Sequence, residues 1–483
     1  MPTPPDFPTA RSQIAGIPVV ELARHYGTPA FVYDAAMILQ RLEDLKAFDV
    51  VRYAQKACSN LAILDLLRRH GALVDCVSAG EIRRALAAGY ASTAGVQGSG
   101  FRVQGSGFRE AGAREQDLGD ADEERGWRPA RDTSSPAPGP EPRTLNPEPS
   151  PPSPAPPIVY TADIFDAESL ELVLAENVHV NCGSPDMIDQ YGSRAPGREI
   201  TLRINPGFGH GHSQKTNTGG DRAKHGIWYG QLGDCLVAAD HYGLSVTGLH
   251  MHIGSGTDLE HLSQVCSAME RAALQVGRNL QSISVGGGLP IPYKPDQSYV
   301  DLGRYFALCD AVRKRLEDRF GHPLRLEIEP GRYIVAEAGY LVTEIRAVKR
   351  QGANLFYLVD AGFNNLARPI LYGAYHPISI APLDGDLARP LHEVVVGGPL
   401  CESGDIFTQE EGGFVAKRSL PIAAVGDLLV IERAGAYGFV MGSNYNSKPL
   451  AAEVLLQDGR SHLIRRRQTF DDLVRGEVVP GAK

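Results

Sequence analysis

Residues 50–57 read VVRYAQKA, a short apolar run that predicts a β-strand with a lysine, Lys56, at its end. Burial disfavours the charged form of a lysine, so a core-facing Lys56 would offer a neutral amine that can form a Schiff base with an aldehyde cofactor. A lysine whose stem packs while its ammonium reaches water would have the same sequence pattern. The stretch therefore predicts the strand and leaves the role of Lys56 open.

Seven further apolar runs of strand length follow along the chain, and helical patterns separate most of them. With 50–57, the predicted strands are 74–78, 158–163, 178–184, 200–206, 246–254, 282–288 and 325–331, and the clearest helices are 79–88, 167–175, 259–275 and 299–320. Strands that alternate with helices indicate a parallel sheet. Eight of them predict an α/β fold with a closed (β/α)8 TIM-like barrel over 35–332, and an open sheet of the same elements is the alternative.

Residues 333–483 have a different pattern, in which strand-like alternation is broken by Gly and Pro. The strands predicted here are 340–348, 356–359, 392–396, 427–431 and 453–456. This pattern indicates a separate, largely antiparallel β domain. The N-terminal segment, 1–34, is predicted to join that domain through a strand at 31–33.

Residues 92–157 differ in composition from the rest of the chain. The heptapeptide VQGSGFR occurs twice in succession, at 96–102 and 103–109, and 134–157 is dominated by Pro, Ser, Ala, Gly and Glu. Such a segment buries too little apolar surface to offset the entropy of ordering it. We therefore predict a disordered, low-complexity insertion in the loop from the second barrel helix to the third strand. Loops of that kind lie on the barrel face opposite an active site.

The composition excludes several classes of protein. A net charge of -9 opposes nucleic-acid binding, which needs a basic surface to neutralise phosphates. The sequence has no run of about 18 consecutive apolar residues and no signal-peptide core, so no membrane association is expected. Its seven cysteines lack zinc spacing and Cys-x-x-Cys pairs, so we predict reduced thiols and no metal site. These features predict a cytoplasmic protein and leave import into an organelle open.

Polar residues and glycines gather at the ends of the predicted strands, which is where (β/α)8 barrels build their active sites. These residues are Lys56, Asp75, Ser78, His252, Ser255, Gly286, Gly287, Gly288, Glu329, Gly331 and Arg332. Packing alone does not explain so many unusual residues at one rim. The pattern predicts a site at the carboxyl ends of the strands.

This set suits one cofactor, pyridoxal 5'-phosphate (PLP). Backbone N–H groups of the glycines, together with a helix that follows them, would attract a phosphate, and the Ser255 hydroxyl would add a donor. Glu329 would pair with the pyridine nitrogen and keep it protonated, which makes the ring an electron sink. A tight turn is the alternative for the glycines, and a solvated salt bridge between Glu329 and Arg332 is the alternative for the carboxylate.

Two histidines compete for the place against the cofactor ring. Residues two apart on a strand share a face, so His250 and His252 point the same way. Periodicity does not choose between them. A lone histidine at a strand end is more often a satisfied core residue.

Taken together, these residues resemble those of the bacterial-type meso-diaminopimelate decarboxylases, a family within the barrel class of PLP-dependent decarboxylases. The resemblance covers nearly all of the chain outside 92–157, including NPGFGHGH at 205–212, HMHIGSG at 250–256, EPGR at 329–332 and CES at 401–403. It implies that Lys56 forms the Schiff base, that His252 rather than His250 stacks on the ring, and that Glu329 meets the pyridine nitrogen. It assigns the phosphate to Ser255, the glycines at 286–288 and Tyr437, while Asp75, Ser78, Gly331 and Arg332 complete the expected cofactor site.

The same resemblance implies an activity, the decarboxylation of meso-2,6-diaminopimelate at its D-centre to L-lysine and carbon dioxide, the last step of lysine biosynthesis. Arg332, Arg368 and Tyr372 would hold the distal carboxylate, with Tyr437 also in the substrate site. The family is homodimeric with active sites at the interface, where the partner subunit would supply Cys401 and Glu402. Cys401 would be the acid that reprotonates the substrate carbon, and Glu402 would bind the distal ammonium.

Other interpretations stay open at this point. A related decarboxylase or an amino-acid racemase would share the barrel, the lysine and the phosphate site, although a racemase needs a second base and no Cys-Glu-Ser segment. A catalytically inactive relative usually lacks the lysine or the cysteine, and both are present here. For Cys401, the alternative is a buried, inert thiol.

Overall fold

The computed structural model describes residues 6–92, 154–209, 217–255 and 258–480. The disorder predicted for 92–157 therefore falls mostly outside the described residues. The end of that range belongs to the barrel, which corrects the predicted boundary. The carbonyl of Pro156 accepts a hydrogen bond from Arg52 at 2.7 Å, and that of Pro157 accepts one from the Val74 N–H at 3.1 Å.

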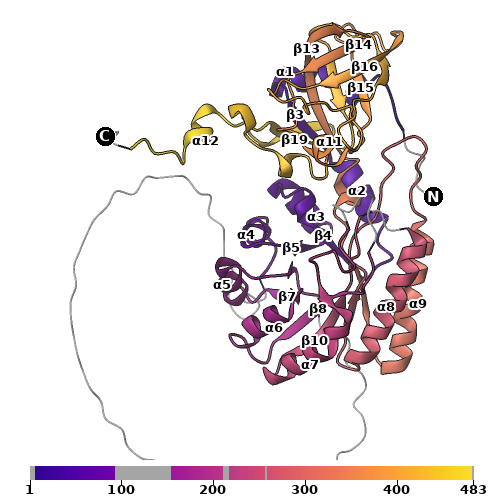
Figure 1. Cartoon of the computed structure of the whole chain (residues 1–483), viewed down its shortest axis with the longest axis vertical. Coiled ribbons are helices and arrows are strands. Elements are labelled where there is room, and N and C mark those ends of the chain that lie inside the picture. The colour runs from indigo at the N-terminus through magenta and orange to yellow at the C-terminus, as the bar shows by residue number, and fades with distance from the viewer. Residues whose placement is uncertain (1–5, 93–153, 210–216, 256–257, 481–483) are drawn as a thin grey trace, which may run out of the picture. The chain divides into compact units, whose positions relative to one another are not determined.

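Eight parallel strands close into a barrel (Figure 1). They are β4 (Val50–Ala54), β5 (Leu73–Cys76), β6 (Ile158–Ala162), β7 (His179–Cys182), β8 (Glu199–Asn205), β10 (Ser245–His250), β11 (Ser282–Ser284) and β12 (Arg325–Ile328). Strand β12 pairs with β4, and β10 pairs with both β8 and β11, so the sheet has no free edge. The predicted closed barrel is confirmed. A two-residue strand, β9 (Ile227–Trp228), pairs in parallel with the end of β8.

Helices lie on the outside of this barrel (Figure 1). They are α3 (Leu61–Arg69), α4 (Ala79–Ala87), α5 (Ala167–Ala175), α6 (Pro185–Gly192), α7 (Leu232–His241) with the 3₁₀ turn η4 (Tyr229–Gln231) before it, α8 (Leu259–Val276) and α9 (Leu302–Phe320). Several begin at a polar cap: the side chains of Asn60, Ser78, Asp166, Asp258 and Asp301 each accept a backbone N–H of the first turn. No helix in the described ranges is long and apolar enough to cross a membrane.

The rest of the chain forms a second, largely antiparallel sheet. Its strands are β3 (Ala30–Asp34), β13 (Gly339–Gln351), β14 (Asn354–Val359), β15 (Ile378–Ala381), β16 (Leu391–Gly397), β17 (Arg418–Pro421), β18 (Leu428–Ile431), β19 (Ala452–Gln457) and β20 (Arg460–Arg465). As predicted, the N-terminal strand β3 joins it, between β13 and β19. Smaller elements are β1 (Gln13–Ile14), β2 (Ile17–Pro18), α1 (Val19–Tyr26), α2 (Ala35–Glu43), α10 (Arg332–Val335), α11 (Arg368–Tyr372), α12 (Phe470–Val474), η5 (Phe439–Met441) and η6 (Tyr445–Ser447).

Buried ion pairs tie the β domain to the barrel rim. The Glu337 carboxylate, just after α10, lies 2.8 Å from an Arg41 nitrogen of α2 and 3.0 Å from an Arg433 nitrogen. All three side chains are nearly inaccessible to water, so losing one partner would leave a buried charge uncompensated. Nearby, the Tyr437 N–H donates to the Ala57 carbonyl at 2.8 Å. The loop that carries Tyr437 is thereby held against the turn that carries Lys56.

Candidate active site

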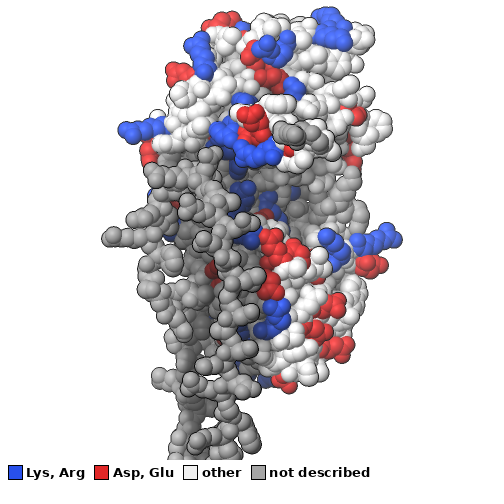
Figure 2. Space-filling view, turned by 90° about the vertical axis from the view of Figure 1, so that its left-hand side faces the viewer, with Lys and Arg blue, Asp and Glu red and all other residues white. Residues whose placement is uncertain are grey.

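A cavity of about 1610 Å³ opens at the carboxyl ends of the barrel strands. Lys and Arg side chains are visible in a recess of the molecule in Figure 2. The barrel lines the cavity with Lys56, Thr161, Asp163, Arg203, His225, His252 and Ser255, and Arg332, Arg368, Tyr372, Arg418 and Tyr437 complete its wall. The site therefore lies where the strand-end rule predicts it, but the β domain builds one of its sides.

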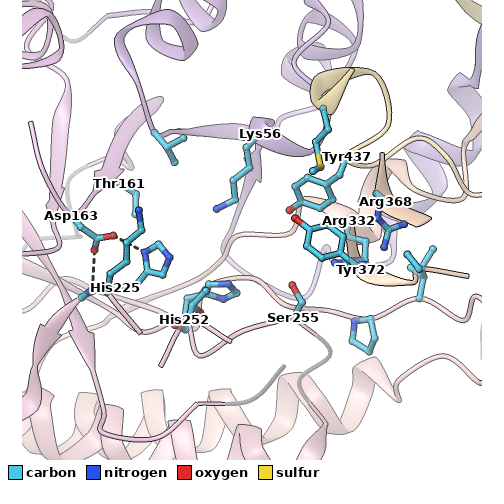
Figure 3. Close-up of a pocket in the computed structure, with 18 of the residues that line it drawn as sticks. Lys56, Thr161, Asp163, His225, His252, Ser255, Arg332, Arg368, Tyr372 and Tyr437 are labelled. Atoms are coloured by element: carbon cyan, nitrogen blue, oxygen red, sulfur yellow. Dashed lines mark hydrogen bonds and ion pairs between the residues drawn. The ribbon is translucent and has the colours of Figure 1, made fainter. Parts of the chain in front are cut away.

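Lys56 extends into this cavity. Strand β4 stops at Ala54, and Lys56 lies in a 3₁₀ turn, η1 (Gln55–Ala57), where its two neighbours are buried while its own side chain is exposed. Figure 3 shows the amine directed into the space between the Asp163–His225 pair and Tyr437. Of the two orientations that the sequence left open, Lys56 therefore does not adopt the one that faces the barrel core. The turn replaces the strand alternation and directs Lys56 away from the barrel core.

His252 lies below Lys56 in Figure 3 and is half-buried. Its Nδ1 accepts the N–H of Gly287 at 3.2 Å, which fixes the orientation of the ring. Burial holds the pKa of His252 well below its usual range, and the positive charges of Arg203 and Lys56 add to the effect. The ring is therefore neutral at physiological pH and can lie against another ring.

The glycines at 286–288 are needed for the close approach of three strand ends. A Cβ at Gly286, where φ is +67°, would lie 2.6 Å from the Met251 carbonyl, and one at Gly287 would lie 2.4 Å from the Glu329 carbonyl. The expected helix is not there: α9 starts only at Leu302, so no helix within the described residues begins at these glycines. The prediction that a helix following these glycines helps to bind a phosphate is therefore wrong.

Glu329 follows β12 and is buried. Its Oε2 lies 2.7 Å from His250 Nε2, and its Oε1 accepts the Ser284 hydroxyl at 3.3 Å. Burial would raise the pKa of Glu329, but the charge and the hydrogen bond of His250 outweigh it and lower the pKa to about 2. Glu329 is thus paired with His250 and not with Arg332, which was the alternative. Burial and the charge of Glu329 raise the pKa of nearby Asp75 to about 6.

Two arginines face the cavity from the first residues of short helices, Arg332 of α10 and Arg368 of α11. Arg368 is buried, and one of its nitrogens donates to the Tyr293 hydroxyl and to His376 Nε2, both at 3.0 Å. His376 Nδ1 lies 3.0 Å from the Glu432 carbonyl, which assigns the ring proton to Nδ1 and leaves Nε2 as the acceptor. No carboxylate among the described residues forms an ion pair with either arginine. The pair is prepared for an anionic ligand.

The cavity contains part of the predicted site. Seven predicted residues line it: Lys56, His252, Ser255, Arg332, Arg368, Tyr372 and Tyr437. Asp75 and Glu329 are buried in the barrel, Ser78 caps α4, and Gly331 lies against Ala54, where an added Cβ would be 3.0 Å from the carbonyl. Gly256 lies outside the described residues.

Cys401 and Glu402 are exposed on a turn after β16 and do not belong to the cavity wall of their own chain. The Cys401 N–H donates to the Asn446 side chain at 2.9 Å. The alternative of a buried thiol is wrong for Cys401, because it is exposed while the other six cysteines are buried. One chain alone therefore does not bring Cys401 to Lys56.

Other cavity residues were not predicted. His225 Nδ1 lies 2.6 Å from Asp163 Oδ2, and the Gly226 N–H donates to Asp163 Oδ1 at 2.8 Å (Figure 3). Asp163 directly follows β6, so the strand-end rule could have found it. Arg203, Tyr293 and His225 had no comparable signal, because Arg203 lies within a strand and the other two lie in loops.

Comparisons with known proteins agree with this geometry. Residues 36–106 and 152–336 match the family described as pyridoxal-dependent decarboxylase, pyridoxal binding domain. The interruption, 107–151, lies inside the predicted insertion. The diaminopimelate decarboxylase of Escherichia coli (strain K12) is 46% identical over 463 residues, which cover 95% of this chain and 96% of that protein.

The chain belongs to the diaminopimelate decarboxylase family. The Streptomyces coelicolor member of this diaminopimelate decarboxylase family is 46% identical over 481 residues, covering 99% of this chain and 96% of its own. A crystal structure of a diaminopimelate decarboxylase matches with a TM-score of 0.81 at 45% identity and covers 96% of both chains. The Helicobacter pylori diaminopimelate decarboxylase complexed with L-lysine matches with a TM-score of 0.73 at 28% identity, over 94% of this chain and 98% of its own.

Proposed function

We propose that this protein decarboxylates meso-2,6-diaminopimelate at its D-centre, giving L-lysine and carbon dioxide in the last step of lysine biosynthesis. One observation carries the proposal: Arg332 and Arg368, without a carboxylate partner among the described residues, share a cavity with the amine of Lys56. An amino acid with two carboxylates, attached through its amine at one end and held by its carboxylate at the other, fits this pair of features.

The cofactor of the proposed reaction is PLP. The residues suit it, because the Lys56 amine enters the cavity, the neutral ring of His252 and the Ser255 hydroxyl lie on its wall, and the ionised carboxylate of Glu329 is buried behind them. Tyr437 lies on the same wall and would complete the phosphate site. When bound, PLP supplies an electron sink for the electron pair left by the departing carbon dioxide.

The arginines orient the substrate. Tyr293 and His376 hold the Arg368 guanidinium, and the Arg332 guanidinium lies 5.6 Å from the centre of the Tyr437 ring. A carboxylate bound by two fixed guanidinium groups loses its freedom to rotate, which restricts which bond of the substrate is exposed to cleavage. Ornithine and arginine would place a cation there instead, and the two positive charges would repel it.

The proton donor comes from a second subunit. We propose a homodimer in which Cys401 Sγ of one chain holds the proton that reaches the substrate carbon in the other, while Glu402 binds the distal ammonium. The exposure of both residues, and their absence from the cavity wall of their own chain, support this arrangement. An exposed, polar turn is also better suited to a contact between subunits than to the core of its own chain.

The proposal is tested with a panel of substrates. Purified protein supplied with PLP is incubated separately with meso-diaminopimelate, ornithine, arginine and lysine, and the release of carbon dioxide is measured. We expect release from meso-diaminopimelate alone. Release from ornithine or arginine at a comparable rate, or no release from meso-diaminopimelate, would refute the proposed function.

Replacement of Arg368 tests the distal carboxylate site. We expect Arg368→Met to lower kcat/KM for meso-diaminopimelate by about 10²- to 10³-fold, mainly through KM. The reason is that the distal carboxylate of the substrate loses one of the two guanidinium groups that bind it in the buried site. Steady-state kinetics on the same substrate measure the change. Arg346→Met, on the exposed part of β13, is the control and should leave KM unaltered. An unchanged KM in Arg368→Met would remove Arg368 from the substrate site.

A further inference from the structure

A second cavity, of about 540 Å³, lies at the amino ends of the barrel strands, opposite the first. The starts of several strands line it, through His179, Glu199, Thr247, Ser282 and Arg325. His250 and Glu329 also belong to its wall, whereas Lys56 and His252 belong to the wall of the first cavity. The pair formed by His250 and Glu329 therefore lies between the two cavities.

His250 is a buried titratable residue that the proposed reaction does not yet use. It is the last residue of β10, and its side chain is 2% exposed. Its Nε2 approaches Glu329 Oε2 to 2.7 Å. A carboxylate only accepts hydrogen bonds, so the Nε2 of His250 carries the proton and donates it. The hydrogen bonds from His250 and from the Ser284 hydroxyl, one to each oxygen, restrict the orientation of the Glu329 carboxylate.

The other ring nitrogen of His250, Nδ1, differs from Nε2 in its surroundings. Within the described ranges, Nδ1 is buried without a hydrogen bond, and so is Oδ1 of Asn181, which lines the same second cavity. Buried polar atoms are normally satisfied, so an unsatisfied Nδ1 is an exception that calls for a reason. Among the described residues, the hydrogen bond to Glu329 is the one that the His250 ring makes.

We propose that His250 is a positioning residue, which aims the Glu329 carboxylate at the pyridine nitrogen of PLP and keeps it ionised. The inference rests on the proposed role of PLP in this protein. Glu329 alone would be a carboxylate in a poorly hydrated environment, where the protonated form is favoured. A neutral Glu329 could not stabilise a protonated pyridine nitrogen.

The test compares two substitutions of His250. His250→Leu removes the donor to Glu329, whereas His250→Gln keeps an N–H donor at the position of Nε2. The first readout needs no turnover: NMR of PLP that carries the heavy nitrogen isotope in its ring reports whether this nitrogen is protonated in the loaded protein. We expect a protonated ring nitrogen in the wild type and in His250→Gln, and an unprotonated one in His250→Leu at neutral pH.

Kinetics provide the second readout. We expect kcat on meso-diaminopimelate to fall by about 10- to 100-fold in His250→Leu and to recover largely in His250→Gln, as for other residues that orient a group contacting the cofactor. In His250→Leu, Glu329 takes up a proton at a higher pH than in the wild type. As the pH falls, the turnover of this variant should therefore begin to decline at a pH at least about one unit higher than that at which wild-type turnover declines.

His179→Leu is the matched control. His179 also lines the second cavity, but it bonds Thr201 at 2.8 Å and does not touch Glu329. We expect this variant to retain the wild-type ring protonation and pH profile. The inference is overturned if His250→Leu retains a protonated ring nitrogen, or if His179→Leu changes the ring nitrogen to the same extent. If the wild type loads PLP but does not act on meso-diaminopimelate, the proposed function fails and the NMR comparison still decides the role of His250.

Discussion

Lys56→Ala is expected to lower the turnover of meso-diaminopimelate by at least about 10⁴-fold, because we propose that Lys56 binds the cofactor covalently and gives it up to the substrate amine. The amine enters the cavity from the η1 turn, where its position is fixed by buried neighbours on both sides. Release of carbon dioxide measures the loss.

A covalent label separates loss of chemistry from loss of fold. After borohydride reduction of the PLP-loaded wild type, mass spectrometry should find the cofactor on the peptide that contains Lys56, and Lys56→Ala should carry none. Lys46→Ala, an exposed lysine paired with Glu43, is the control and should keep both label and turnover. Labelling of Lys224 or Lys294, which also line the cavity, would reassign the attachment site.

Cys401→Ala is expected to lower turnover by about 10²- to 10⁴-fold, the usual contribution of a general acid. A mixture of the two inactive variants is expected to regain activity. If each active site combines Lys56 of one subunit with Cys401 of its partner, neither variant alone is active, but a dimer of one Lys56→Ala chain and one Cys401→Ala chain contains one intact site. Random exchange makes about half of the dimers mixed, so about one quarter of the wild-type turnover should return.

The recovery is measured after the two inactive variants are unfolded and refolded together, or after they are expressed together. A mixture of Lys56→Ala with the double variant Lys56→Ala, Cys401→Ala is the control and should stay inactive. If the two single variants do not restore activity together, although size analysis shows mixed dimers, Cys401 does not serve the partner's site. The exposure of Cys401 outside its own cavity makes recovery the expected result.

The barrel could be predicted from the sequence because its strands are short apolar runs separated by amphipathic helices. The predicted strands nevertheless ran too far at their carboxyl ends. The range 246–254 was predicted, but β10 stops at His250, and 282–288 was predicted, but β11 stops at Ser284. Beyond these points the sequence is still apolar or glycine-rich, but the backbone no longer forms the hydrogen bonds of the sheet and instead forms the loops of the site.

The strands that were missed are short and lack a clear pattern. Strand β15 has four residues between two prolines, β17 starts with an arginine and ends on a proline, and β20 carries three charged or polar residues at its start. Each is a strand only because a neighbour in the sheet offers hydrogen bonds to it. Periodicity within the segment does not contain that information.

By itself, the sequence determined approximately where the barrel strands end, and therefore that Lys56, His252, Ser255, Glu329 and Arg332 lie near one rim. That step follows from local periodicity and from the common direction of parallel strands. Only the tertiary structure decided where each side chain points. It turned Lys56 into the cavity through a 3₁₀ turn, paired Glu329 with His250, and brought Arg368, Tyr372 and Tyr437 from the β domain to the same cavity. The pairing of Glu329 and the assembly of the cavity wall depend on contacts between segments far apart in the chain, which no local pattern encodes.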